Sequence, residues 1–304
     1  MKLHHTLTHD SKAPPLVLAI GFFDGLHRGH QELIRQTLRL RRPGYRAGVL
    51  TFANHPSTYL RPGSEPPLIC TPEERIDLFG KAGLDECFFI PFDGAIAQLS
   101  PSQFLEIVVE GLGARGVVVG SSFRFGHKRA GDTAVMAQIL SDRGVQAILV
   151  PAVEGEGERI SSTRIRKAIA SGETDLADRL LGDSYTLRGR VVMGAGRGHD
   201  LGFPTANIDP PLKLLPKDGV YAATARYDGR DYAALVSIGT NPTFSGTSRS
   251  VEAWLRDFQA AIYGEELALR DLRFVREQQK FDSVDALLLQ MQNDTLSIPY
   301  PNFK

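Results

Sequence analysis

The sequence predicts two domains: an α/β domain built on a parallel sheet, followed by an antiparallel β domain that ends in a helix. Three observations carry this prediction. The chain has 304 residues, about twice the ~150 residues usual for one domain. Apolar, β-rich runs alternate with helical patterns from Leu16 to Val150, as in parallel sheets covered by crossover helices. After about Gly182, alternating runs separated by Gly, Pro and Asp follow, which places the boundary between residues 183 and 184.

Five short apolar runs in the first domain indicate strands that are buried on both faces. They are Leu16–Ile20, Ala47–Phe52, Cys87–Ile90, Gly116–Val119 and Gln146–Val150. Capping residues mark two helix starts between them. Thr71 stands three residues before Glu74, the spacing of a capping box. Ser100 precedes Pro101 at the start of another helix, which Gly113 is expected to end.

The second domain carries period-two runs that indicate antiparallel strands. They are Tyr185–Met193, Gly219–Tyr227, Tyr232–Ile238 and Val251–Leu255. The last segment, Ser283–Met291, has apolar residues at Val284, Leu287, Leu288 and Met291. This helical spacing predicts one apolar helix face lying on a sheet. We therefore expect a barrel with one helix.

Composition excludes several classes of protein. Lys plus Arg and Asp plus Glu number 35 each, so the chain lacks the overall positive field that nucleic-acid binding uses. No apolar run reaches the ~18 residues of a membrane helix, and the N-terminus lacks an apolar signal core. We expect a cytoplasmic protein without a nucleic-acid or membrane partner, with homo-oligomerisation left open. Cys70 and Cys87 lack metal-binding spacing and are expected to be reduced and structural.

A glycine-rich turn follows the first strand of this sheet, between Gly21 and His30, and leads into a helical run. Such a turn lets backbone N–H groups and a helix N-terminus face a phosphate. His27 and His30 can donate hydrogen bonds to a phosphate under attack, and with Gly29 they match the His-x-Gly-His signature of nucleotidyltransferases. The alternatives are ordinary polar turn residues or a metal-binding pair.

Two further basic segments follow strands of the first domain. In ISSTRIR, Ser162 and Thr163 can cap a helix while Arg166 reaches a triphosphate. The alternative for the arginines is a solvated helix face. The loop GSSFRFGHKRAGD offers Arg124 and Arg129 to phosphate or adenine.

The second domain contains its own candidate site. Gly194 and Gly196 belong to a glycine-rich connection that can cradle phosphates through backbone amides, although such glycines also occur in hairpins and bulges. Thr205 and Asn207, two apart on a strand, can serve Mg²⁺ or form a turn. Glu252 on an alternating strand is a candidate general base for a hydroxyl, or a solvated residue.

Motifs in both halves resemble one family. GFFDGLHRGHQ, TFANHP, VVVGSSFRFGHKRAGD and ISSTRIR resemble the adenylyltransferase module of the bacterial bifunctional riboflavin kinase/FAD synthetase. GRVVMGAGRGHDLGFPTANI, PKDGVYAA, SIGTNPTF, VEAWLRDF, IYGEEL and VREQQKF resemble its flavokinase module. The likeness spans nearly the whole chain.

The resemblance implies a Rossmann-like nucleotidyltransferase domain followed by a six-stranded antiparallel β-barrel flavokinase domain with a C-terminal helix. Riboflavin and ATP would give FMN, and FMN and ATP would give FAD and pyrophosphate, with Mg²⁺ and no bound redox cofactor. His27 and His30 would stabilise the transition state at the α-phosphate, and Glu252 would activate the ribityl 5′-hydroxyl. The resemblance assigns to nucleotide binding Gly21, Phe22, Asp24, Gly29, Ser162, Thr163, Arg166, Gly194, Gly196, Thr205 and Asn207, the last two also holding the metal. It assigns to flavin binding Asn54, His55 and Arg124.

The sequence departs from the family pattern at four positions. Asn54 stands where proline is common, Ser122 where an acidic residue is frequent, His199 in place of an arginine, and Trp254 in place of a histidine. Two other functions compete with the bifunctional enzyme. One is a nucleotidyltransferase acting on another phosphorylated acceptor, such as phosphopantetheine, with a barrel that only binds substrate. The other is a flavin-responsive binding protein without catalysis.

Overall fold

A computed structural model describes residues 1–8, 13–194, 204–240, 249–296 and 298 of the chain. They form two compact units, Met1–Ser162 and Thr163–Lys304. The boundary predicted between residues 183 and 184 lies inside the second unit, after its helices and before its barrel, and stays a prediction of where an autonomous kinase domain begins.

The first unit contains a six-stranded sheet in which every pair of neighbouring strands is parallel, in the order β1-β4-β3-β2-β5-β6. The strands are β1 (Lys2–His4), β2 (Leu16–Ile20), β3 (Arg46–Phe52), β4 (Glu86–Ile90), β5 (Ala114–Gly120) and β6 (Gln146–Val150). The predicted α/β fold and its five strands are confirmed. The short edge strand β1 lacks an apolar run because its side chains are largely exposed.

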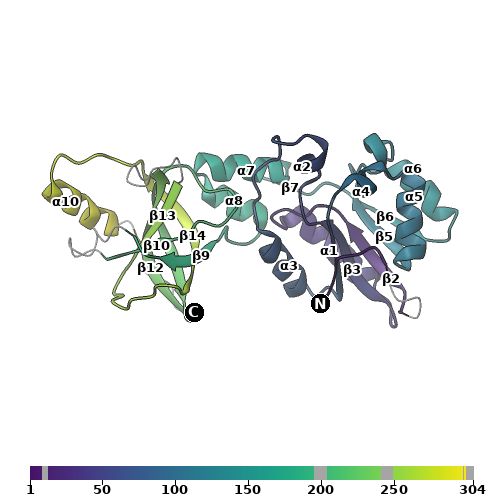
Figure 1. Ribbon diagram of the computed structural model, residues 1–304, viewed down its shortest axis with the longest axis horizontal. Helices are drawn as coiled ribbons and strands as arrows, with labels where there is room; N and C mark the ends of the chain where they lie inside the picture. The colour runs from purple at the N-terminus through teal and green to yellow at the C-terminus, as the bar shows by residue number, and fades with distance from the viewer. Residues whose placement is uncertain (9–12, 195–203, 241–248, 297, 299–304) are drawn as a thin grey trace. The chain divides into compact units, whose positions relative to one another are not determined.

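Helices cover both faces of this sheet (Figure 1). The helical segments of the first unit are α1 (Arg28–Leu40), α2 (Pro56–Leu60), α3 (Pro72–Lys81), α4 (Gly94–Gln98), α5 (Pro101–Glu106), the π-helix η1 (Ile107–Gly111), the 3₁₀ helix η2 (His127–Arg129) and α6 (Thr133–Ser141). Helices α1 and α3 pack on one face through residues such as Ile34 and Phe79. Helices α5, η1 and α6 pack on the other through Leu105 and Met136.

Both predicted helix starts are confirmed. Thr71 Oγ1 accepts from the Glu74 N–H at 3.2 Å, and the Glu74 carboxylate accepts from the Thr71 N–H at 2.9 Å. Ser100 and Gln103 form the same reciprocal capping box at the start of α5. The helix that begins there ends before Gly113, which adopts a φ of +71°.

In the second unit, six strands close into an antiparallel barrel in the order β10-β13-β12-β11-β14-β9. They are β9 (Leu187–Val192), β10 (Thr205–Ile208), β11 (Gly219–Tyr227), β12 (Arg230–Thr240), β13 (Arg249–Leu255) and β14 (Glu266–Arg276). The strand pattern alone does not reveal β14. The buried side chains of β14 alternate at Leu267 and Leu269, but the next buried one is Leu272. The alternation is interrupted at Asp271, which has a φ of +55° and lies where the pairing with β11 shifts.

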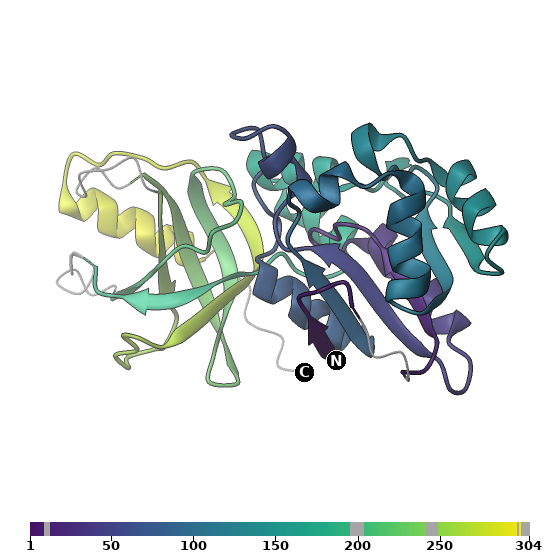
Figure 2. The ribbon, with the colours of Figure 1, turned by 45° about the vertical axis from the view of Figure 1, so that its right-hand side comes forward.

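The C-terminal helix is α10 (Val284–Thr295), which lies alongside the barrel strands (Figure 2). The predicted helix is confirmed, but the placement of Val284 on its packed face is wrong, because that residue is 54% exposed. A buried polar contact anchors the helix instead. The guanidinium of Arg276 on β14 donates to the Asp294 carboxylate at 3.0 and 2.6 Å.

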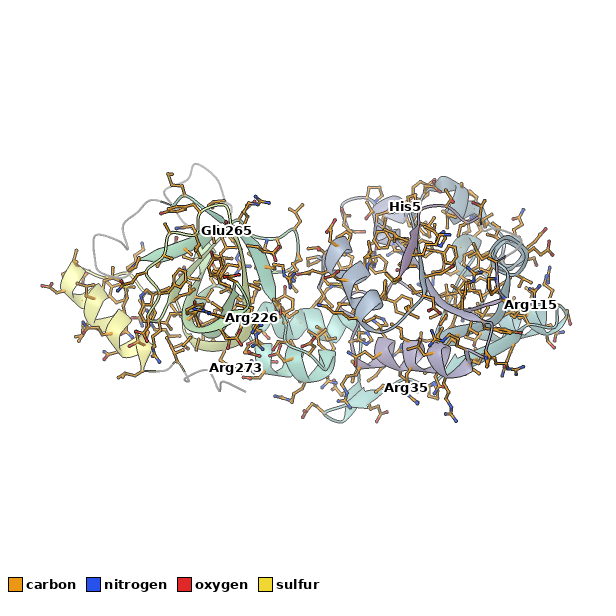
Figure 3. The ribbon with its side chains drawn as sticks, turned by 90° about the horizontal axis from the view of Figure 1, so that it is seen from below. His5, Arg35, Arg115, Arg226, Glu265 and Arg273 are labelled. Atoms are coloured by element: carbon orange, nitrogen blue, oxygen red, sulfur yellow. The ribbon has the colours of Figure 1, made fainter. Side chains whose placement is uncertain are left out.

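Two helices precede the barrel, α7 (Ser162–Ser171) and α8 (Thr174–Leu181). Helix α8 packs on β14, where Arg273 pairs with Asp178 at 2.9 Å and with Asp175 at 2.5 Å. Figure 3 shows Arg273 beside these helices. Burial raises the pKa of Asp178 despite hydrogen bonds from Tyr185 and Arg273. The two helices are therefore built into the compact unit of the barrel.

Candidate active sites

A groove of about 390 Å³ opens at the carboxyl ends of the parallel strands. We call it the histidine groove; it is lined by residues 20–23, 27, 29, 30, 33, 120–124, 129, 150–153 and 159–162. The chain leaves β2 toward β3 on one side, and β5 lies on the other side. This is the point where strand order reverses, and open α/β sheets bind ligands at such points.

The two predicted histidines lie together in this groove. His27 is the N-cap of α1, and its Nδ1 accepts from the His30 N–H at 3.3 Å. The two rings stack with centroids 3.6 Å apart and planes 16° apart. Gly29 between them leaves room for this arrangement, because a Cβ there would stand 3.1 Å from the His27 ring, which would then have to shift. Since Nδ1 of His27 is an acceptor, a neutral His27 ring carries its proton on Nε2 and can donate it. The stacked rings do not support the metal-pair alternative.

His30 is held as a neutral ring. Burial lowers its pKa well below the ordinary value, and the neighbouring charges of His27 and Arg75 lower that pKa further. Within the described part of the chain, its Nδ1 is buried and makes no hydrogen bond. Phe23 contacts the ring edge-on at a centroid distance of 5.2 Å. A neutral imidazole in this position has one N–H to donate to an oxyanion.

The lining of the histidine groove is strongly basic. Its described residues include Arg124, Arg129 and Arg159 and no aspartate or glutamate. Arg129 adopts a left-handed φ of +60°. Arg159 belongs to β8 (Glu158–Arg159), which pairs with β7 (Glu154–Gly155), and it donates to Ser122 Oγ at 2.8 Å. A chain of zero net charge therefore concentrates cations where a polyanion would bind.

Sequence reasoning did not assign Arg159, although it stands two residues before the ISSTRIR hydroxyls. Ser122, left without a role because an acidic residue is frequent there, is the partner that holds Arg159. A signal was present in the sequence: a basic residue stands directly before a segment that is predicted to bind phosphate.

The remaining predicted nucleotide residues fall into three groups. Gly21 and Phe22 line the groove. Ser162 also lines it and donates to the Asp24 carbonyl at 3.1 Å. The Asp24 carboxylate does not line the groove: it is buried and accepts from the backbone N–H groups of Ile69 and Cys70.

Thr163 and Arg166 begin the second unit. Helix α7 starts at Ser162, so Ser162 and Thr163 lie in its first turn and not at the capping position. Thr163 is exposed and Arg166 is half-buried.

A second groove, of about 470 Å³, shares a wall with the first. We call it the aromatic groove; it is lined by residues 21, 22, 52, 56, 59, 60, 92, 96–98, 104 and 123–129. Its aromatic members are Phe22, Phe52, Tyr59, Phe92, Phe104, Phe123 and Phe125. The shared wall consists of Gly21, Phe22, Phe123, Arg124 and Arg129. An apolar groove therefore runs directly into a cationic one.

The predicted flavin residues relate to the aromatic groove in different ways. Arg124 lines it, with a loose ion pair to Asp132 at 3.7 Å. Both ends of the Asn54 amide bind the backbone of Phe92, at 2.9 and 2.8 Å, so Asn54 places the Phe92 ring in the groove wall. His55 is the N-cap of α2 and meets the Phe22 ring edge-on at 4.7 Å.

The barrel brings three of its predicted residues to one face. Asn207 on β10 is directly opposite Glu252 on β13, and Thr205 is opposite Trp254. Opposed residues share a face of the sheet, whereas Val251 and Ala253 point to the buried side. We call Thr205, Asn207, Glu252 and Trp254 the barrel face.

Gly194 lies against the barrel face, because a Cβ there would stand 2.0 Å from the Asn207 amide nitrogen. Gly196 and His199 lie outside the described residues. Thr205 also borders a pocket of about 200 Å³ that sequence reasoning missed, with Leu255, Phe258, Ile262 and Tyr263 in its wall.

Comparison with known proteins gives two family matches. Residues 9–164 match the FAD synthetase family and residues 181–298 match the riboflavin kinase family. A bifunctional riboflavin kinase/FMN adenylyltransferase from Listeria monocytogenes is 36% identical, covering 96% of this chain and 94% of its own length. Its namesake from Escherichia coli K12 is 32% identical, with 98% and 96% covered. The chain belongs to the bifunctional riboflavin kinase/FMN adenylyltransferase family.

Membership of this family confirms the resemblance read from the motifs, the two-domain fold and the two enzymatic activities. Riboflavin, FMN and ATP are the small molecules on which such an enzyme acts. Both competing functions lose their support, since the barrel matches a kinase family and the first unit matches an FAD synthetase family.

A solved structure has the same architecture over the whole chain. The crystal structure described as a macrolide-efflux protein from Streptococcus pneumoniae is 31% identical, has a TM-score of 0.89 and is covered completely, as is this chain. Among the described residues, none of the helices has the length and apolar character needed to cross a membrane.

Two negative findings complete the description of the sites. In the described ranges, no cluster of three or more His, Cys, Asp or Glu side chains could hold a metal ion. Cys70 and Cys87 are free and buried, and burial raises the pKa of each thiol to about 12. The structural role predicted for the two cysteines fits these surroundings.

Proposed function

We propose that the histidine groove binds ATP, that the aromatic groove binds FMN, and that adenylyl transfer takes place at their shared wall. The observation that carries this proposal is the junction itself. A flavin ring system is apolar and flat and suits a groove walled by phenylalanines, whereas a triphosphate suits histidines and arginines without carboxylates. Arg124 and Arg129, which line both grooves, stand where the FMN phosphate would meet the nucleotide.

The reaction at this junction needs positioned donors and no base. A phosphate oxygen of FMN attacks the α-phosphorus of ATP, the bond to the β-phosphate breaks, and pyrophosphate leaves. The attacking phosphate is already an anion at neutral pH. His27 Nε2–H and the neutral His30 ring can donate to the α-phosphate oxygens as charge builds. The groove arginines would neutralise the leaving pyrophosphate.

We assign riboflavin phosphorylation to the barrel face. The 5′-hydroxyl of the ribityl chain attacks the γ-phosphorus of ATP and loses its proton to the Glu252 carboxylate, and ADP leaves. Asn207 stands opposite Glu252 in the sheet, so the phosphate-binding side and the base share one surface. The apolar pocket beside Thr205 offers room for the adenine ring.

Mg²⁺ fits the barrel face by its donor chemistry. Thr205 contributes a hydroxyl and Asn207 an amide oxygen on the same face of β10. Mg²⁺ usually takes one or two protein oxygens and completes its shell with phosphates and water. When bound, it would polarise the phosphoryl oxygens of ATP, and these two side chains would orient it.

The placement of FMN is tested by Arg124→Ala. This side chain is 49% exposed, so the substitution spares the core. Losing a charged hydrogen bond to phosphate costs about 1.5–3 kcal/mol, hence FAD formation from FMN should fall about 10- to 100-fold, with riboflavin phosphorylation unchanged. Arg35→Ala is the matched control, since Arg35 is an exposed residue of α1 (Figure 3) that pairs with Glu32. FAD formation at the parental rate in Arg124→Ala would exclude FMN phosphate from the shared wall.

A further inference from the structure

Arg75 on α3 is the largest fully buried side chain of the described residues and lies behind the shared wall. One terminal nitrogen donates to the Phe22 carbonyl at 2.7 Å. The other donates to the carbonyls of Phe52 and Ala53 at 2.9 and 3.4 Å. Phe22 follows β2, and Phe52 and Ala53 mark the end of β3. One guanidinium therefore ties together the carboxyl ends of two neighbouring strands.

The surroundings of Arg75 are unusual for a buried cation. Its guanidinium carbon lies 4.5 Å from the Phe22 ring centroid and 4.9 Å from that of Phe89. The buried Asp24 carboxylate stabilises this charge electrostatically while it accepts from the backbone N–H groups of Ile69 and Cys70 before α3. Burying a charge is costly even when an opposite charge is near. A residue needed only to fill space here would be apolar.

The contacts of Arg75 converge on the site. Phe22, whose carbonyl it holds and whose ring it touches, lines both grooves. A second donor, Thr51 Oγ1, binds the same carbonyl at 2.9 Å. The charge of Arg75 also contributes, after burial and His27, to keeping the pKa of His30 low.

We propose that Arg75 is a positioning residue for FMN adenylylation. By fixing the ends of β2 and β3, it holds Phe22 and the shared wall at the spacing that brings the FMN phosphate to the α-phosphate of ATP. The inference rests on the proposed assignment of the two grooves. Displacing reacting groups by about 1 Å can cost about 10² in rate even when the substitution is far from the chemistry.

The test compares Arg75→Lys with Thr51→Val. Lys keeps the charge but has one nitrogen where Arg75 uses two to reach the two strand ends, so kcat for FAD formation should fall about 10- to 100-fold while the KM values for ATP and FMN change much less. Thr51→Val removes only the second donor to Phe22 and should lower kcat severalfold in the same manner. Riboflavin phosphorylation by the same chain should stay at the parental rate in both variants.

Partial unfolding would lower kcat for a different reason, and two measurements separate the causes. Saturating ATP and FMN stabilise the folded state, so a loss caused by unfolding shrinks at saturation and at low temperature, whereas a positioning loss persists. Arg46→Lys is the matched control: Arg46 is a half-buried arginine that pairs with Glu86 at the opposite end of β3. It should lower the unfolding temperature and leave kcat for FAD formation unchanged.

The outcomes decide between the proposals. Parental kcat in both Arg75→Lys and Thr51→Val overturns the positioning role, as does a parental Thr51→Val if Arg75→Lys fails to fold. A loss of FAD-forming rate that is seen at low substrate concentrations but disappears at saturating substrates and low temperature also overturns it. Replacement of both His27 and His30 by Ala reports on the groove assignment separately: if that variant still forms FAD, the assignment itself is wrong.

Discussion

The two candidate active sites of this chain are built from different parts of their folds. The histidine groove gathers loops at the ends of parallel strands, and its described lining holds two histidines and three arginines without a carboxylate. The barrel face uses side chains within the strands and places Glu252 opposite Asn207. The difference between the two sites matches the nucleophile of the reaction proposed for each. A phosphate needs no base, whereas a primary hydroxyl does. Under the proposed assignment of the two sites, the presence or absence of a carboxylate separates the two reactions.

The strongest test of this separation of roles between the two sites is to remove both histidines. His27→Ala combined with His30→Ala should abolish FAD formation, since losing one such donor typically costs about 10² to 10³ in rate. FMN formation from riboflavin should continue, because no residue of the barrel face is touched. Chromatography separates riboflavin, FMN and FAD and reports both steps in one incubation. Equal loss of both activities in a folded protein would contradict the separation of roles.

The reciprocal experiment is Glu252→Gln, which keeps the shape of the side chain and removes the base. A positioned carboxylate contributes about 10² to 10⁴ in rate. Riboflavin phosphorylation should fall by that factor, while supplied FMN is still converted to FAD and the unfolding temperature is unchanged. Phosphorylation at the parental rate under saturating Mg-ATP would make Glu252 a solvated strand residue.

How much the sequence could predict differs between the two grooves of the first unit. One turn and one helix start place His27, Gly29 and His30, which are neighbours in the chain. Their spacing in the sequence was therefore sufficient to predict that they lie together. The aromatic groove is assembled from residues as distant as Phe52 and Phe125. In the sequence each of these looks like an ordinary core residue, because no local pattern shows which rings border a cavity.

The same limit applies to Asn54 and Arg75. Asn54 belongs to a recognised motif, but only the fold shows that its amide is fully engaged with Phe92. Arg75 stands in a helix with charged neighbours and has the pattern of an exposed residue, yet it is 1% exposed. A long polar side chain that binds distant carbonyls gives no periodic signal.

A smaller effect is expected from the protonation of His30. Burial first, then His27 and Arg75, lower its pKa in the folded state, so below about pH 6.5 the unfolded chain binds more protons than the folded one. Stability of the first unit should therefore be constant above this pH with respect to His30 and decline as the pH falls through it.

The measurement is hydrogen exchange of residues 16–40 at pH 7.5 and 5.5, corrected for intrinsic rates. His30→Gln should reduce the loss of protection on acidification without abolishing it, because burial also lowers the pKa of His4. His5→Gln, at an exposed position (Figure 3), serves as the control. The same loss of protection in wild type and His30→Gln would show that His30 is not the titrating group.

The smallest effect concerns where the barrel domain begins. A fragment starting at Asp183 should fold alone and phosphorylate riboflavin, since roughly 120 residues suffice for a domain core and the barrel face lies on β10 and β13. A matched fragment starting at Thr163 adds α7 and α8, with the contacts of Thr174 and Asp178 to β14. These contacts contribute modestly to the stability of the longer fragment, because burying the Asp178 carboxylate opposes the stabilisation that it gains from Arg273.

The longer fragment should therefore unfold a few degrees higher, as about 1 kcal/mol shifts the midpoint of such a domain by roughly 4–8 °C, and both should produce FMN at the same rate. Arg273→Ala should lower the unfolding temperature of the longer fragment and leave the shorter one unchanged, because only the longer one contains the partners of Arg273 on α8. An insoluble shorter fragment, or a folded one that makes no FMN, would move the domain boundary to the start of α7 and make the two helices part of the kinase.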